Sequence, residues 1–241
     1  MKAFAALFTE IDASTSTARK VNAMQRYFAS APPADAAWAA YFLAGGKPRQ
    51  TVPTAVMVGS ACDVAGIEPW LFDACYQAVG DLAETIAHVL PLNTDSGTDD
   101  ASREDTGLAE WIEQRLMPLR GQPVPVQAEA LTRWWQQLDD NEAFLLIKLI
   151  GGAFRVGVSK LLVQRALAQT AGLDAKLVAQ RMMGYTDARS VPTPERYAAL
   201  LAPVNEARTL EGGQPYPFFL AHQLGIASDA FDDQLGPSTD W

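Results

Sequence analysis

Apolar residues at helical spacing run through nearly the whole chain and constrain its fold more than any other feature. Near the N-terminus, Phe4, Leu7 and Ile11 recur three and four residues apart, the spacing that lines one face of an α-helix. No alternating run of β-branched residues is long enough for a half-buried strand. Residues 51–58 are the most strand-like, but Pro53 interrupts them. The sequence therefore predicts an all-α fold.

Capping residues and helix breakers divide this pattern into separate predicted helices. One long helix runs from Leu71 to Leu90, and Pro91 ends it. Thr193 followed by Pro194 is typical of a helix start, because threonine caps and proline fits the first turn. The other predicted helices cover residues 4–11, 19–28, 34–43, 108–116, 127–138, 142–150, 159–170 and 174–183.

One polar stretch separates two helical halves. Residues 93–107 hold five acids, one arginine and almost nothing apolar. Such a composition cannot offset the entropy of ordering, so it predicts a flexible acidic loop. The predicted organisation is a helical N-terminal half at 1–92, the loop at 93–107, a second helical half at 108–204, and a Gly/Pro-rich linker beginning at 205 and running to 241.

Composition narrows the class of protein. No apolar run reaches the length of a membrane span. The N-terminal residues do not resemble a signal peptide, because their amphipathic pattern includes Glu10 and Asp12. Two cysteines, Cys62 and Cys75, are too few for a disulfide framework. We expect a soluble cytoplasmic protein with no membrane partner.

Two apolar helices meet at a glycine-rich turn that contains a single arginine. Gly151 and Gly152 follow the first helix, and Arg155, Gly157 and Ser159 precede the second. Glycine lets a ligand approach the backbone closely, and amides at a helix start bind phosphate. Arginine can hold a phosphate through two parallel hydrogen bonds. The pattern is typical of a nucleic-acid backbone clamp; a tight turn whose arginine caps carbonyls is the alternative.

The distribution of charge favours the clamp. The formal net charge is −9, and residues 51–147 carry sixteen acidic and four basic side chains. Residues 148–200, which include the turn, carry eight basic and three acidic side chains. Because phosphate binding depends on a local basic surface, the net charge does not exclude nucleic acid.

Three segments, in this order, resemble the N-terminal DNA-binding domain of ATP-dependent DNA ligases. They are Val-Gly-Asp-Leu-Ala-Glu-Thr at 79–85, Gly-Gly-Ala-Phe-Arg-Val-Gly-Val-Ser at 151–159, and Gln-Arg-Met-Met-Gly at 180–184. The likeness covers most of residues 1–221 and is greatest with the bacterial repair-associated ligases. It implies a multi-helix DNA-binding domain in which the glycine–arginine turn at 151–159 packs on the minor groove and contacts phosphates.

The resemblance carries over residue by residue at the glycine–arginine turn. The matching DNA-binding positions are Gly152, Phe154, Arg155, Gly157, Ser159 and Lys160. Phe154 is expected to be partly core, holding the turn in place.

Other cations are candidates by position only. Lys148 precedes the glycines, where a cation also suits the helix dipole, and a solvated surface role is at least as reasonable for Arg165. For two basic pairs, solvated surface is the default and DNA contact the alternative. These pairs are Arg19 with Lys20, and Lys47 with Arg49.

Two further groups of residues have a structural explanation that is stronger than a functional one. Asp81, Glu84 and His88 are spaced for one helix face, but a surface acid pair is favoured over a metal site. In the family the 79–85 segment supports helix packing. Among the tryptophans, Trp38, Trp70 and Trp111 are expected in the core, while one of Trp134 and Trp135 is expected at a domain contact.

The resemblance also says what an intact ligase would need. A lysine in a Lys-x-Asp-Gly motif would take AMP from ATP with Mg²⁺, and no lysine here is followed by x-Asp-Gly. Residues 217–221 resemble the segment just before that motif, so we expect the sequence to stop short of the adenylation domain. This region would then have no catalytic residue and bind no cofactor or metal.

The expected role is to hold nicked double-stranded DNA, as a monomer, for sealing in repair, recombination or replication, near the nucleoid and alongside other repair proteins. A different class, an α-helical protein-interaction scaffold that uses the acidic faces, remains the alternative. A free-standing enzyme is disfavoured, because no nucleophile–base or metal constellation is visible in the sequence.

Overall fold

The structure, a computed structural model, describes residues 1–91, 106–151, 154, 156–187 and 191–203. The chain divides into two compact units, Met1–Asn205 and Glu206–Trp241, and the described residues all belong to the first. Every regular element among them is helical, so the predicted all-α fold is confirmed.

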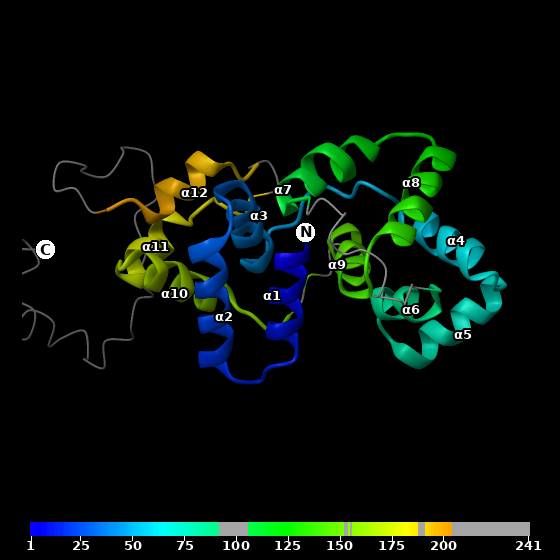
Figure 1. The fold of residues 1–241 in the computed structure, drawn as a ribbon, viewed down its shortest axis with the longest axis horizontal. Helices are drawn as coiled ribbons and strands as arrows, with labels where there is room; N and C mark the ends of the chain where they lie inside the picture. The colour runs from blue at the N-terminus through cyan, green and yellow to red at the C-terminus, as the bar shows by residue number, and fades with distance from the viewer. Residues whose placement is uncertain (92–105, 152–153, 155, 188–190, 204–241) are drawn as a thin grey trace, which may run out of the picture. The chain divides into compact units, whose positions relative to one another are not determined.

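The helices are short and are labelled in Figure 1. A π-helical turn (Trp111–Leu116) and a 3₁₀ turn (Met117–Leu119) follow α7. The α-helices are α1 (Lys2–Asp12), α2 (Thr17–Ser30), α3 (Pro33–Leu43), α4 (Thr54–Ala65), α5 (Pro69–Val79), α6 (Leu82–Val89), α7 (Leu108–Glu110), α8 (Val124–Gln137), α9 (Asp140–Gly151), α10 (Lys160–Ala171), α11 (Ala175–Arg181) and α12 (Pro194–Leu201).

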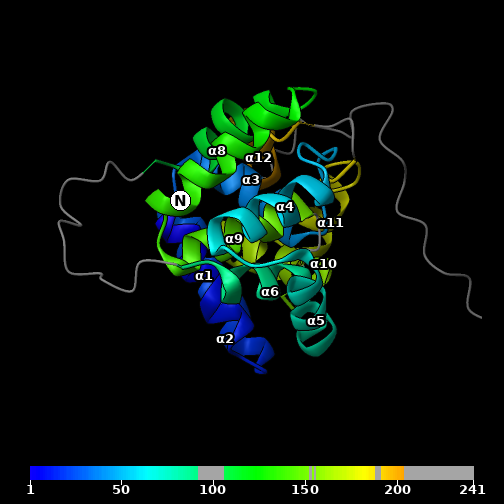
Figure 2. The same ribbon diagram turned by 90° about the vertical axis from the view of Figure 1, so that its right-hand side faces the viewer.

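Helices that are distant in the sequence pack together in two groups, as Figure 1 and Figure 2 show. In the first group, α2 packs on α10 and α3 on α12, with α1 and α11 beside them. In the second group, α4 packs on α8 and α6 on α9. We call these the α2–α10 group and the α4–α9 group. Contact between α1 and α9 joins them.

Each group therefore takes helices from both sides of the predicted acidic loop. The loop itself, apart from Thr106 and Gly107, lies outside the described residues. Its flexibility and the division at 93–107 stay predictions, as does the linker assigned to 205–241.

Helix α3 lies at the centre of the core. All eight residues from Ala36 to Leu43 are buried, as expected of a helix that is apolar on every side. The first turn of α3 also contacts α7, because the Asp35 carboxylate accepts a hydrogen bond of 2.8 Å from the Ala109 amide at the start of α7. Surface turns of the first unit can therefore pack against a buried helix.

The predicted single helix from 71 to 90 is wrong. Gly80 has a left-handed φ of +81° and ends α5, a conformation that glycine adopts without strain. Asp81 is then the N-cap of α6, and its carboxylate accepts a hydrogen bond of 3.0 Å from the Glu84 amide. Asp81 therefore does not share a helix face with Glu84 and His88.

The prediction about Trp70 is also wrong, because it was expected in the core but 68 % of its surface is exposed on α5. Trp134 and Trp135 are both buried, and the expected domain contact of one of them stays a prediction. Trp134 packs edge-on against Trp111, with ring centroids 5.6 Å apart.

No single helix among the described residues is long and apolar enough to cross a bilayer. Helices α4 and α5 have the length and composition of a span only when taken together, and they are bent by 109° relative to each other.

Candidate nucleic-acid interface

The glycine–arginine turn connects α9 to α10. Helix α9 ends at Gly151, and Ser159 is the N-cap of α10. Gly157 has a φ of +60°, a left-handed conformation that side chains with a Cβ rarely adopt. Gly152 and Arg155 lie outside the described residues, so their DNA contacts stay predictions.

Phe154 attaches the turn to the core. Its half-buried ring lies 5.7 Å from the ring of Phe4 and nearly parallel to it. It also packs against Phe8 at 5.1 Å and Phe42 at 5.8 Å. Three aromatic rings from α1 and α3 thus fix the middle of the turn, and aromatic pairs of this kind add to the stability that burial provides.

Lys20 holds the far end of the turn, a role that the sequence did not predict. Its side chain is buried under the turn, and its ammonium donates hydrogen bonds of 2.9 Å to the Val156 carbonyl and 3.1 Å to the Gly157 carbonyl. Because these carbonyls point at Lys20, the negative ends of two peptide dipoles are neutralised inside the protein. One sequence signal existed: Lys20 falls on the buried stripe of α2 with Met24 and Tyr27.

The start of α10 offers amides and cations to solvent. Ser159 occupies the N-cap position, but its hydroxyl accepts no hydrogen bond from the first turn. The first amides of a helix lack intrahelical partners and carry the positive end of its dipole. Lys160 and Arg165 are both exposed. Gln164, one helical turn after Lys160, is buried.

Lys148 lies in a different environment. Its side chain is 8 % exposed, and its ammonium is 2.8 Å from both oxygens of Asp81. Burial alone would raise the pKa of Asp81, but the hydrogen bonds from Lys148 and the Glu84 amide, together with the Lys148 charge, lower it. This ion pair joins α9 to the start of α6. We therefore leave Lys148 out of the proposed DNA surface.

The segment at 180–184 also has a structural role. The Arg181 guanidinium donates hydrogen bonds of 3.0 and 2.6 Å to the carbonyls of Leu200 and Ala202. Its positive charge there stabilises the C-terminal end of the α12 dipole. The adjacent Met182 is fully buried. Of the remaining cations, Arg19, Lys47 and Arg49 are exposed, and whether they touch DNA stays open.

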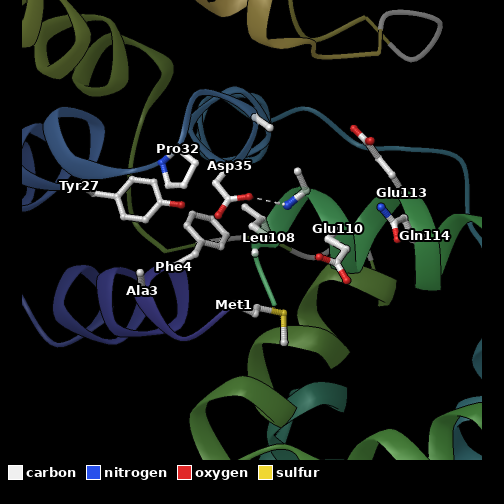
Figure 3. Close-up of a pocket in the computed structure, with 13 residues that line it drawn as sticks. Met1, Ala3, Phe4, Tyr27, Pro32, Asp35, Leu108, Glu110, Glu113 and Gln114 are labelled. Atoms are coloured by element: carbon white, nitrogen blue, oxygen red, sulfur yellow. Dashed lines mark hydrogen bonds between the residues drawn. The ribbon is translucent and has the colours of Figure 1, made fainter. Parts of the chain in front are cut away.

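A pocket of about 470 Å³ near the N-terminus is a second candidate site. Figure 3 shows that Asp35, Glu110 and Glu113 contribute carboxylates to it. Asp35 accepts from the Ala109 amide, Glu113 accepts from the indole of Trp38 at 2.7 Å, and Glu110 lies 3.8 Å from Arg115. These acids therefore have structural partners. No group of three or more His, Cys, Asp or Glu placed for a metal occurs in the described part of the chain.

The comparisons with known proteins agree with the all-α fold. A family model described as DNA ligase N terminus matches residues 1–168. No curated protein is detectably similar in a direct sequence comparison. The match spans α1 to most of α10 and includes the 79–85 and 151–159 segments. The chain belongs to the N-terminal domain family of ATP-dependent DNA ligases. Complete enzymes of this class use ATP and a metal ion.

Proposed function

We propose that this region holds nicked duplex DNA for a ligase of the bacterial repair type, through phosphate and minor-groove contacts that do not depend on base sequence. The family match over residues 1–168 is the observation that carries the proposal. The intact enzyme would seal nicks in repair, recombination or replication, in the cytoplasm close to the nucleoid.

The geometry of the glycine–arginine turn supports this role. Packing of Phe154 and the hydrogen bonds from Lys20 hold residues 154, 156 and 157 from beneath, so these residues have little entropy left to lose when a ligand binds. Exposed Gly157 leaves its backbone accessible, and exposed Lys160 and Arg165 follow on α10. Phosphate contacts of this kind position a protein on DNA without reading its sequence.

The cofactors of the intact enzyme do not fit the residues of this chain. No lysine in the sequence is followed by x-Asp-Gly, and the described residues hold no metal-binding group. We propose that the chain by itself transfers no nucleotide and acts as a DNA-binding monomer.

Matched variants test the location of the surface. Lys160→Gln removes an exposed cation at the start of α10, whereas Arg133→Gln removes an exposed cation on α8 in the α4–α9 group. Fluorescence anisotropy with a labelled nicked duplex should show weaker binding for Lys160→Gln alone, equally for duplexes of unrelated sequence. Equal losses for the two variants, or a strong preference for one sequence, would refute the proposed surface.

A further inference from the structure

Helix α5 has a composition that is unusual for its exposure. Asp73 is the only charged and Gln77 the only amide side chain among its eleven residues, Pro69–Val79, and most of the others are apolar or aromatic. A helix that is apolar on nearly every side is normally buried. In α5 only Phe72 is buried. Trp70 is 68 % exposed, and Leu71, Tyr76 and Val79 are 37–38 % exposed.

The exposed apolar residues cover more than one side of α5. Leu71, Tyr76 and Val79 flank Phe72, whose side faces the protein. Trp70 is two residues from Phe72 and therefore points away from it, along the same side as Ala74. Figure 1 shows α5 at the end of the first unit away from α11. Helix packing of α5 is mainly against α6, so its outer side has no helical neighbour in the described part of the chain.

Acidic side chains surround this apolar helix. Residues 51–90 contain five acids and neither lysine nor arginine. Asp63, Glu68 and Asp73 are exposed and lie around the junction of α4 and α5. Burial raises the pKa of the Cys62 thiol there, and the charges of these three carboxylates raise it further. The three acids therefore lie close enough to the buried Cys62 to act on it together.

We propose that α5 is a docking site for a protein segment that presents apolar side chains flanked by lysine or arginine. We call the exposed Trp70 and the adjoining Leu71, with Asp63, Glu68 and Asp73, the α5 face; Tyr76 and Val79 lie on the other side of the helix, beside Phe72. Large exposed apolar side chains mark interaction sites, and a tryptophan at the centre of such a site often dominates binding. Opposite charge favours a basic partner and speeds its association.

The same charges disfavour other occupants. DNA phosphates and anionic lipids would be repelled by the three acids. A second copy of the chain would bring two acidic faces together, which is unfavourable for the same reason. The proposal does not depend on DNA binding, because the described residues of the glycine–arginine turn contact α1, α2 and α3 and not α5.

Two synthetic helical peptides of equal length test this proposal on the full chain. One combines leucine with lysine, and the other combines leucine with glutamate. Binding of each labelled peptide is followed by anisotropy and by acrylamide quenching of tryptophan. The lysine peptide should bind, protect Trp70 from quenching, and bind less well as salt rises. The glutamate peptide should bind far more weakly.

Variants locate the binding to the α5 face. Trp70→Ala should weaken binding of the lysine peptide about tenfold or more, the range for a central aromatic. Glu68→Gln with Asp73→Asn should weaken it and flatten its salt dependence. Leu161→Ala, which removes a side chain that is 63 % exposed on α10, is the control and should change nothing. Binding of nicked DNA by Trp70→Ala should equal that of the unaltered chain.

Several results would overturn the proposal. Trp70 is mostly exposed, so its replacement leaves no cavity, and circular dichroism can verify the fold. An unchanged affinity of folded Trp70→Ala for the lysine peptide would reject the α5 face. Equal binding of the glutamate peptide would remove the charge argument. Dimerisation in sedimentation, or binding to zwitterionic vesicles, that Trp70→Ala abolishes would assign the face to a second copy or to lipid.

Discussion

Lys20→Met tests whether Lys20 supports the glycine–arginine turn or instead contacts DNA through its charge. Methionine retains the apolar stem of the side chain but removes the donors that reach the Val156 and Gly157 carbonyls. A hydrogen bond from a charged group contributes about 1.5–3 kcal/mol, and an unsatisfied buried carbonyl costs about 1–3 kcal/mol. The hydrogen bond to the Gly157 carbonyl is only partly buried. We therefore expect Lys20→Met to destabilise the ordered turn by about 2–4 kcal/mol in total.

That loss should appear in two measurements. Amide hydrogen exchange at residues 156–158 should become faster, because the ordered turn is populated less. Affinity for nicked DNA should fall by about tenfold or more, since about 1.4 kcal/mol corresponds to a factor of ten. The salt slope of binding should stay unchanged, because the Lys20 ammonium is occupied by carbonyls and does not reach phosphate.

Lys160→Met is the matched control. It removes an exposed charge from the start of α10, so it should lower the salt slope by about one phosphate. Exchange at 156–158 and the melting temperature should not change. If Lys20→Met lowers the salt slope while exchange of the turn stays slow, Lys20 contacts DNA and our account of its role is wrong.

Three other predictions rest on the sequence or on the structure. Arg155→Ala should weaken DNA binding by about 1–3 kcal/mol, the range for a charge-assisted contact, with helicity unchanged; loss of thermal stability with normal affinity would instead make Arg155 a structural cap. Gly157→Val should reduce both binding and stability, because its Cβ would lie 2.8 Å from the Lys20 ammonium at a φ of +60°. Asp81→Asn should lower the melting temperature at pH 7. The pKa of Asp81 is lowered by folding, so its ionised form stabilises the protein above the unfolded-state pKa. That stability is lost as pH falls through the folded-state pKa, and the melting temperatures of the two proteins should converge once the pH is below it. A difference that persists there would show that the pair with Lys148 is not the cause.

The absence of a Lys-x-Asp-Gly motif gives a prediction about chemistry. Incubated with labelled ATP and Mg²⁺, the chain should gain no covalent AMP, because none of its lysines has the flanking Asp-Gly. A labelled band on a denaturing gel would contradict the proposal that this region only binds DNA.

Local patterns were enough to predict most of the helices, but not α4, whose first residues looked strand-like, and not all of the helix ends. The apolar spacing before Gly80 continues in phase into Leu82 and Ile86, so periodicity alone favoured one helix. The structure instead uses the glycine to end α5 and Asp81 to cap α6. At Thr193 the cap was predicted and is present, since its hydroxyl accepts from the Arg196 amide. Caps are local, and a sequence can show them.

Long-range partners explain what the sequence could not show. Lys20 bonds to carbonyls more than 130 positions away, and Lys148 pairs with Asp81 across 67 positions. Each lysine belongs to a buried stripe of its own helix, but only the packing of α2 on the turn and of α9 on α6 reveals the partner. Trp70 shows the converse: its spacing suits a core position, yet no described element covers it.

The salt dependence of binding to nicked duplex DNA tests the central claim most directly. If the glycine–arginine turn and the start of α10 hold two or three phosphates, affinity should fall about 10- to 50-fold between about 50 and 200 mM salt. Duplexes of different sequence should give the same slope. An affinity that does not change over this range, or no binding at the lowest salt, would contradict a phosphate-binding surface in this region.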